Sequence, residues 1–146
     1  MRGATDAHNR ARAAVQPAAP APLQKLSWDC GLQAIAQRWA DRCEFKHSHG
    51  ATGENLFAGT ADHYEPSAVV EDWVSEKKDY RLAGNSCSGV CGHYTQVVWA
   101  NTRRVGCAMQ TCTSHSPFGA SYGAWQLWVC EYDPPGNYVG QRPYGN

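Results

Sequence analysis

The segment Gly92-His93-Tyr94-Thr95-Gln96-Val97-Val98-Trp99 combines one histidine, several side chains that can hydrogen-bond to the backbone, and an apolar end. The apolar end suits a buried core, whereas the histidine is a candidate for chemistry. The segment matches no standard metal or nucleophile motif, so local physics marks it only as a candidate site. We expect a short helix over residues 93–99.

The composition is that of a globular chain without an electrostatic bias. The 146 residues fit about one domain, and we expect a single domain over residues 1–146 with an irregular tail over residues 133–146. The 13 basic residues balance the 13 acidic ones, which disfavours a nucleic-acid partner or an anionic membrane surface. No apolar run of the sequence approaches the ~20 residues of a membrane span.

Cysteine usage indicates an oxidising compartment. The sequence holds seven cysteines and no CxxC pair, so disulfides are favoured over a zinc ribbon or a thioredoxin-like motif. An odd count leaves one thiol over, and Cys30, alone at an expected helix start beside Asp29, is the candidate. Because Met1 leads directly into a polar segment, we expect a mature secreted form behind an added Met. The cysteines are Cys30, Cys43, Cys87, Cys91, Cys107, Cys112 and Cys130.

Helices are expected early in the chain and strands late, which predicts an α+β fold. Asp29 is a suitable cap for the second helix, and Pro66 suits the first turn of the third. Residues 44–64 and 84–92 are expected to be loops. The expected helices cover residues 4–15, about 30–42, 65–80 and 93–99. The expected strands, which alternate and are rich in β-formers, cover residues 105–111 and 125–132.

Four ionisable residues are candidates for a metal site. Glu76 shares one face of the third helix with apolar residues, where a carboxylate is costly unless it is paired or hydrogen-bonded. With His47, Glu54 and His93 it could complete a Zn²⁺ site of two imidazoles and two carboxylates. These residues are far apart in the chain and lack a spacing such as HExxH. The alternative is that they are surface or hydrogen-bonded polar groups.

Two nucleophile candidates are weaker. Residues 119–123 match GxSxG, but a nucleophile elbow needs a strand before it and a helix after it. Here a proline-containing loop precedes the match and a strand follows, so a hairpin connection is the better interpretation. Cys30 as a nucleophile would need a histidine nearby in space, and nothing in the sequence places one there.

Several separated motifs occur in a fixed order over about residues 5–144. They are Ala7-His8-Asn9-x-x-Arg12, Leu26-Ser27-Trp28-Asp29, Cys43-x-x-x-His47-Ser48, Gly53-Glu54-Asn55-Leu56, Trp73-x-x-Glu76-x-x-x-Tyr80, GHYTQVVW followed by Gly106-Cys107, and Cys130-x-Tyr132-x-Pro134-x-Gly136-Asn137-Tyr138. Together they resemble the CAP superfamily of cysteine-rich secretory proteins, antigen 5 and pathogenesis-related protein 1. The tail GNYVGQRPY is most similar to the plant pathogenesis-related protein 1 branch.

The resemblance implies a three-layer α-β-α sandwich with a central antiparallel sheet, and secretion. The family's cleft set of two His and two Glu falls on His47, Glu54, Glu76 and His93, so Glu76 would have imidazole partners. Such a cleft could bind Zn²⁺ or another divalent metal through neutral imidazoles, with an affinity that falls near pH 6. The disulfides that the resemblance implies are Cys43–Cys112, Cys87–Cys91 and Cys107–Cys130, with Cys30 unpaired.

This sequence departs from the family at three places, one of which is the tail, where Gly145-Asn146 follows Tyr144. Glu131 stands where the family often has Asn between Cys and Tyr. Tyr80 of a sterol-binding loop is present, but Leu82 and Cys87 occupy the places of two further aromatics, which weakens the case for sterol binding by that loop.

The resemblance implies a secreted, non-enzymatic, defence-related protein that binds sterol, fatty acid or another lipid. Microbial membrane sterols or an extracellular protein are the expected partners, and a monomer is expected, with a Cys30-linked dimer as the alternative. A second hypothesis is a precursor that is cut between Asp133 and Pro134 to release a signalling peptide. A third is a metal-dependent hydrolase in which a glutamate of the cleft is the general base.

Overall fold

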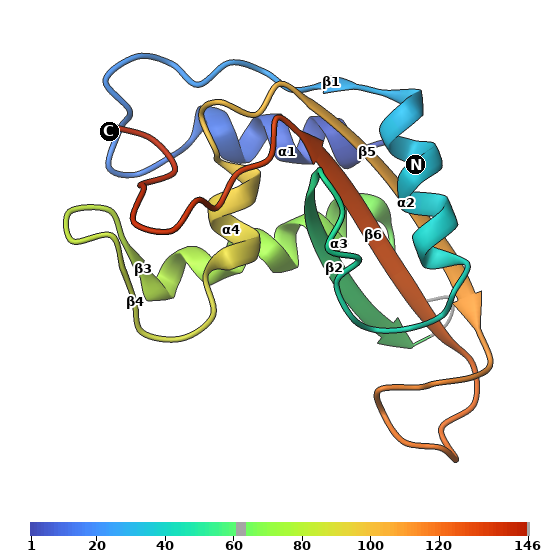
Figure 1. The fold of residues 1–146 in the computed structure, drawn as a ribbon. Helices are drawn as coiled ribbons and strands as arrows, with labels where there is room; N and C mark the ends of the chain where they lie inside the picture. Colours follow the sequence, from blue (N-terminus) through green and yellow to red (C-terminus); the bar gives the residue numbers. More distant parts are fainter. Residues whose placement is uncertain (61–63, 146) are drawn as a thin grey trace.

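A four-stranded sheet lies at the centre of the computed structural model, which describes residues 1–60 and 64–145 (Figure 1). The strand order is β1-β5-β6-β2. β2 and β5 run antiparallel to β6, whereas the two-residue β1 runs parallel to β5. The expected antiparallel sheet is thus confirmed for its long strands, and β1 makes the sheet mixed. The strands are β1 (Ser27–Trp28), β2 (Gly53–Thr60), β5 (Arg104–Cys112) and β6 (Trp125–Asp133).

Helices cover both faces of this sheet, which confirms the α-β-α layers. On one face α2 packs against β5 and β6. The opposite face lies under the other three helices, whose buried side chains share one core with Trp128 and Tyr132 of β6. Asp29 caps α2 as predicted, because its side chain accepts a hydrogen bond from the Leu32 N–H at 2.9 Å. The helices are α1 (Ala4–Ala13), α2 (Cys30–Ala40), α3 (Pro66–Val74) and α4 (Gly92–Val97).

The two predicted strands are confirmed, and their alternation builds the two cores. Along β6, Leu127 and Val129 belong to the core beneath α2, whereas Trp128 and Cys130 belong to the core on the opposite face. Successive side chains of a strand point to opposite faces of the sheet. Because helices cover both faces, every residue of β6 from Trp125 to Tyr132 is buried.

The expected loop over residues 44–64 is wrong for residues 53–60, which form β2. This segment contains Gly53, Glu54, Asn55 and Gly59, which are residue types that strands disfavour. It pairs along its whole length with β6, from Gly53 opposite Tyr132 to Thr60 opposite Trp125. Tertiary pairing therefore overrides local propensity. Residues 61–63 lie outside the described residues, so the prediction is not tested there.

The third helix ends earlier than expected. α3 stops at Val74, and a 3₁₀ helix, η1 (Ser75–Asp79), carries the chain to Tyr80. There β3 (Tyr80–Arg81) pairs with β4 (Ser86–Cys87). Tyr80 lies opposite Cys87 in this hairpin, so strand pairing competes with a further helical turn.

Disulfides and the C-terminal tail close the structure. The bonds Cys43–Cys112, Cys87–Cys91 and Cys107–Cys130 are present, and Cys30 is a free, exposed thiol. After β6 the described tail is irregular, as predicted, yet it is packed: Tyr144 is buried and its hydroxyl donates to the Pro17 carbonyl at 2.7 Å. Within the described part of the chain, no helix has the length and apolar character needed to span a membrane.

Candidate functional site

His47 and Glu54 form one imidazole–carboxylate pair. Oε1 of Glu54, on β2, lies 2.9 Å from Nδ1 of His47. The Ser48 N–H also donates to Oε1, at 2.9 Å, and the Ser48 hydroxyl donates to Oε2 at 2.6 Å. Burial acts to raise the pKa of Glu54, but hydrogen bonds from Glu131, Ser48 and His47 outweigh burial and leave that pKa lowered. Glu54 is therefore an ionised acceptor with both oxygens engaged.

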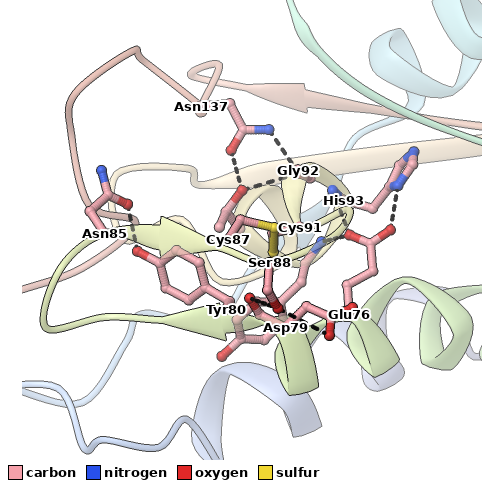
Figure 2. The surroundings of a disulfide bond; sticks show 12 residues. Glu76, Asp79, Tyr80, Asn85, Cys87, Ser88, Cys91, Gly92, His93 and Asn137 are labelled. Carbon is pink, nitrogen blue, oxygen red and sulfur yellow. Dashed lines mark hydrogen bonds and ion pairs between the residues drawn. A yellow bond between two sulfur atoms is a disulfide. The ribbon is translucent and has the colours of Figure 1, made fainter.

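His93 and Glu76 form the second pair, which joins η1 to α4 (Figure 2). Oε2 of Glu76 lies 2.7 Å from Nδ1 of His93. Oε1 accepts the backbone N–H groups of both His93 and Tyr94, each at 3.0 Å. The ring of Trp73 stacks on the imidazole with 6.1 Å between centroids. The partners that Glu76 required are thus one imidazole and two N–H groups.

The four residues expected to form one metal site are arranged as these two imidazole–carboxylate pairs. Among residues 1–60 and 64–145, no three His, Cys, Asp or Glu side chains are close enough together to hold a metal ion. Each carboxylate accepts a hydrogen bond from Nδ1, which leaves the lone pair of the neutral imidazole on Nε2. Carboxylates in this position commonly orient a metal-binding histidine. Each pair therefore leaves one Nε2 available as a ligand atom, on His47 and on His93, with Glu54 and Glu76 as the groups that orient the rings.

Asn55 connects the two pairs, a role that the sequence did not reveal. It follows Glu54 on β2, and its side-chain amide donates to the His93 carbonyl at 3.0 Å and to the Tyr132 hydroxyl at 3.2 Å. The Tyr132 hydroxyl is 2.7 Å from Nε2 of His8, whose Nδ1 is 2.7 Å from the Ala4 carbonyl. Burial lowers the pKa of His8 to about 4. A neutral imidazole therefore anchors α1 to the strands behind the cleft.

Glu131 places a third carboxyl group beside the first pair. It lies directly across from Glu54 in the β2–β6 register and is fully buried. The Thr52 hydroxyl donates to its Oε2 at 2.7 Å, whereas its buried Oε1 accepts no hydrogen bond from the described residues. Burial, and after it the neighbouring Glu54 carboxylate, raise the pKa of Glu131 to about 9. At neutral pH Glu131 is thus a protonated acid that can donate to Glu54.

The first pair opens onto a polar cleft, and the C-terminal tail supplies one wall of it. His47 and Glu54 line a cavity of about 450 Å³ that also contacts Gln96 and Asn137. Gln96 accepts a hydrogen bond from the Gly136 N–H at 3.0 Å. Asn137 donates to the Gly92 carbonyl at 2.8 Å and accepts from the Thr95 hydroxyl at 2.6 Å (Figure 2). α4 therefore holds the C-terminal tail beside the cleft.

A second, more apolar hollow lies between α1 and α3. This groove has a volume of about 370 Å³. Lys77 of η1 is its charged member, and Tyr94 of α4, which is buried, contributes an aromatic ring. Sequence patterns did not indicate this groove, because its lining comes from segments far apart in the chain. Its lining residues are Ala11, Ala14, Val15, Gln16, Val74, Lys77 and Tyr94.

The two nucleophile candidates lie in a loop and at an exposed helix start. The GxSxG match lies in the connection from β5 to β6, where Gly119 and Gly123 have positive φ and β6 begins at Trp125. It is a turn-rich hairpin connection, as predicted. Cys30 is the first residue of α2 and is exposed.

Residues 5–132 match the model of the Cysteine-rich secretory protein family, CAP. The chain therefore belongs to this family. It is 44% identical over 145 residues to pathogenesis-related protein 1B of Nicotiana tabacum, an alignment that covers 95% of this chain and 77% of the tobacco protein. The chain is thus similar to the plant pathogenesis-related protein 1 branch.

Solved structures of similar fold agree. The Schistosoma mansoni venom allergen-like protein 4 superimposes with a TM-score of 0.78 at 28% identity, covering 99% of this chain and 93% of that one. The crystal structure of NaASP2 with Zn²⁺ superimposes with a TM-score of 0.71 at 25% identity, covering 98% of this chain and 83% of that one.

Proposed function

We propose that the protein is a secreted, non-enzymatic member of the pathogenesis-related protein 1 group that binds a lipid in the groove between α1 and α3. The groove is the observation that carries this proposal. Its volume of about 370 Å³ lies within the roughly 300–1,000 Å³ typical of small-molecule sites. Its lining is mostly apolar and includes Val15, Val74 and Tyr94, so an apolar chain would displace water there.

A fatty acid matches the groove better than a sterol does. Lys77 supplies a cation at a mostly apolar lining, which complements a carboxylate head group attached to an acyl chain. In the hairpin considered for sterol contact, two of the relevant residues have local partners: the Tyr80 hydroxyl donates to Asn85 at 2.7 Å, and Cys87 is bonded to Cys91 (Figure 2). We retain sterol as the second ligand to test.

We also propose that His47 and His93 bind a divalent metal such as Zn²⁺ through Nε2. The similar protein NaASP2 has a crystal structure with Zn²⁺, which supports a divalent metal as the ligand to test. In this chain both carboxylates are already hydrogen-bonded to the imidazoles, which favours an orienting role for them. Since both imidazoles must be neutral to bind the metal, protons should compete with it for Nε2.

Secretion and a defence role complete the proposal. The three disulfides are typical of extracellular proteins. A defence role is supported by the name of the tobacco relative, pathogenesis-related protein 1B.

Two alternatives receive less support. A hydrolase needs a carboxylate that is free to take a proton from water, but Glu54 and Glu76 each already accept at least three hydrogen bonds. Release of a peptide after Asp133 would require the tail to leave its packed position. The Thr102 hydroxyl donates to the Pro134 carbonyl at 2.9 Å, and the Ala100 N–H donates to the Pro143 carbonyl at 2.8 Å.

Equilibrium titration with a C16 fatty acid and with a sterol tests the lipid proposal. Ala14→Phe should fill the groove and abolish saturable binding, whereas Ala13→Phe, an exposed neighbour outside the lining, should bind as the wild type does. Lys77→Gln should weaken fatty-acid binding more than Lys78→Gln and leave sterol binding unchanged. Equal binding by the two Phe variants, or no binding of either lipid by the wild type, would refute the proposal.

A further inference from the structure

The apolar groove and the second imidazole–carboxylate pair are built from adjacent residues of the same two elements. On η1, Glu76 belongs to the pair and the next residue, Lys77, lines the groove. On α4, His93 belongs to the pair and the next residue, Tyr94, lines the groove. The pair and the groove therefore lie back to back across the contact between η1 and α4.

Glu76 is the residue that spans this contact. Its Oε1 accepts the N–H of Tyr94 at 3.0 Å as well as that of His93. Only 15% of the Glu76 side chain is exposed, so water could not readily replace the carboxylate as the acceptor for these N–H groups. Removing the carboxylate would leave two donors of a helix start without their acceptor, which is unfavourable when donors are buried. Tyr94 would then be free to shift relative to Lys77 and Val74.

We propose that Glu76 is a positioning residue for the lipid groove, although it does not line it. By holding the Tyr94 backbone against η1, it fixes the separation between the aromatic wall of the groove and the wall formed by Val74 and Lys77. This inference rests on the proposed lipid-binding function. It assigns to a residue of the polar cleft a second role in setting which acyl chains the groove accepts.

The chain contains a matched control for this role. Asp29 is a carboxylate that accepts an N–H near the start of a helix, from Leu32 at 2.9 Å. It is the cap at the start of α2, the helix on the opposite face of the sheet, and it does not line the groove. Glu76→Ala and Asp29→Ala should therefore both lower thermal stability, but only Glu76→Ala should alter the groove.

Fatty-acid titrations over a series of chain lengths, with chelator present to exclude metal effects, test this directly. Glu76→Ala should weaken C16 binding roughly tenfold, since about 1.4 kcal/mol corresponds to a factor of ten, and should shift the preferred chain length. Glu76→Gln, which keeps an oxygen acceptor, should stay within about threefold of the wild type. Asp29→Ala should match the wild type in both affinity and preferred length. Unaltered affinity and length preference in Glu76→Ala, or an equal loss in Asp29→Ala, would overturn the proposal.

Hydrogen exchange on the wild type covers the case in which Glu76→Ala fails to fold. Saturating fatty acid should slow exchange of the Tyr94 amide and leave the Leu32 amide unchanged. Equal effects on the two amides would count against the role of Glu76.

If the wild type binds no fatty acid, the proposed function itself fails. If the wild type binds and Ala14→Phe does not, while Glu76→Ala behaves as the wild type does, only the positioning role is refuted.

Discussion

His8 and Glu131 make the buried polar centre of the protein sensitive to pH in opposite directions. His8 is buried, with a pKa of about 4 rather than the usual 6.5. The unfolded chain thus takes up a proton on this imidazole at a higher pH than the folded protein does. The stability that His8 contributes is complete above pH 6.5 and is lost as pH falls from 6.5 towards 4.

We therefore expect His8→Gln to remove part of the acid sensitivity of the fold. A shift of this size corresponds to about 3 kcal/mol between the two pH limits. Urea unfolding of the wild type and of His8→Gln, each at pH 7 and at pH 4, gives the free energy of unfolding that each protein loses between the two pH values. The loss should be smaller for His8→Gln. If both lose the same amount, His8 is not the group responsible.

Glu131 should act with the opposite sign. Its folded pKa of about 9 lies above the usual 4.5, so its contribution is complete below pH 4.5 and declines as pH rises towards 9. Glu131→Gln keeps a donor for Glu54 and an acceptor for the Thr52 hydroxyl without needing to retain a proton. It should raise the free energy of unfolding at pH 7 by about 1–3 kcal/mol. A lower stability of this variant at pH 7 would show that Glu131 is not held as the neutral acid.

At the level of elements, α1 is attached to the rest of the molecule by a buried guanidinium. Arg12 is buried and donates to the carbonyls of Gln24, Val97 and Trp99 at 2.7–3.1 Å. Burial is the main cause that lowers its pKa to about 10, so it remains charged at neutral pH. These bonds join α1 to the end of α4 and to the extended segment before β1.

Arg12→Met should therefore destabilise the fold by about 3 kcal/mol or more, because several buried carbonyls lose their donor. Arg10→Ala is the control on the same helix. Within residues 1–60 and 64–145 its guanidinium makes a single, exposed ion pair, with Glu71 at 3.7 Å, and its loss should change stability by less than about 0.5 kcal/mol. Similar unfolding midpoints for the two variants would contradict this account of how α1 is attached.

The elements also show how far the sequence predicts the structure. Strong alternation predicted β5 and β6, and the Asp29 cap predicted α2. β2 was not predicted, because Gly53 and Gly59 leave it without a strand pattern and its pairing with β6 is a tertiary effect. Residue type suggested the four candidate residues and the resemblance strengthened that hypothesis, but their division into two pairs depends on side-chain hydrogen bonds that no sequence pattern specifies. The burial of Glu131 against Glu54 depends on strand register in the same way.

For the whole molecule, the proposed account separates two kinds of chemistry on one scaffold. A polar cleft lies beside His47 and Glu54, with the tail as one wall. An apolar groove lies between α1 and α3, and Glu76 stands between the groove and the second imidazole. The disulfide Cys43–Cys112 joins positions 69 residues apart and holds the end of β5 to the segment after α2, a constraint that suits an extracellular protein.

The central claim is that the groove between α1 and α3 is where lipid binds. A C16 fatty acid carrying a photoreactive group along its chain, cross-linked to the wild-type protein and mapped by mass spectrometry, tests this most directly. We predict labelling of peptides containing residues 11–16, Val74 and Tyr94, and its loss in Ala14→Phe but not in Ala13→Phe. Saturable labelling confined to the β3–β4 hairpin or to the cleft beside His47 would contradict the account.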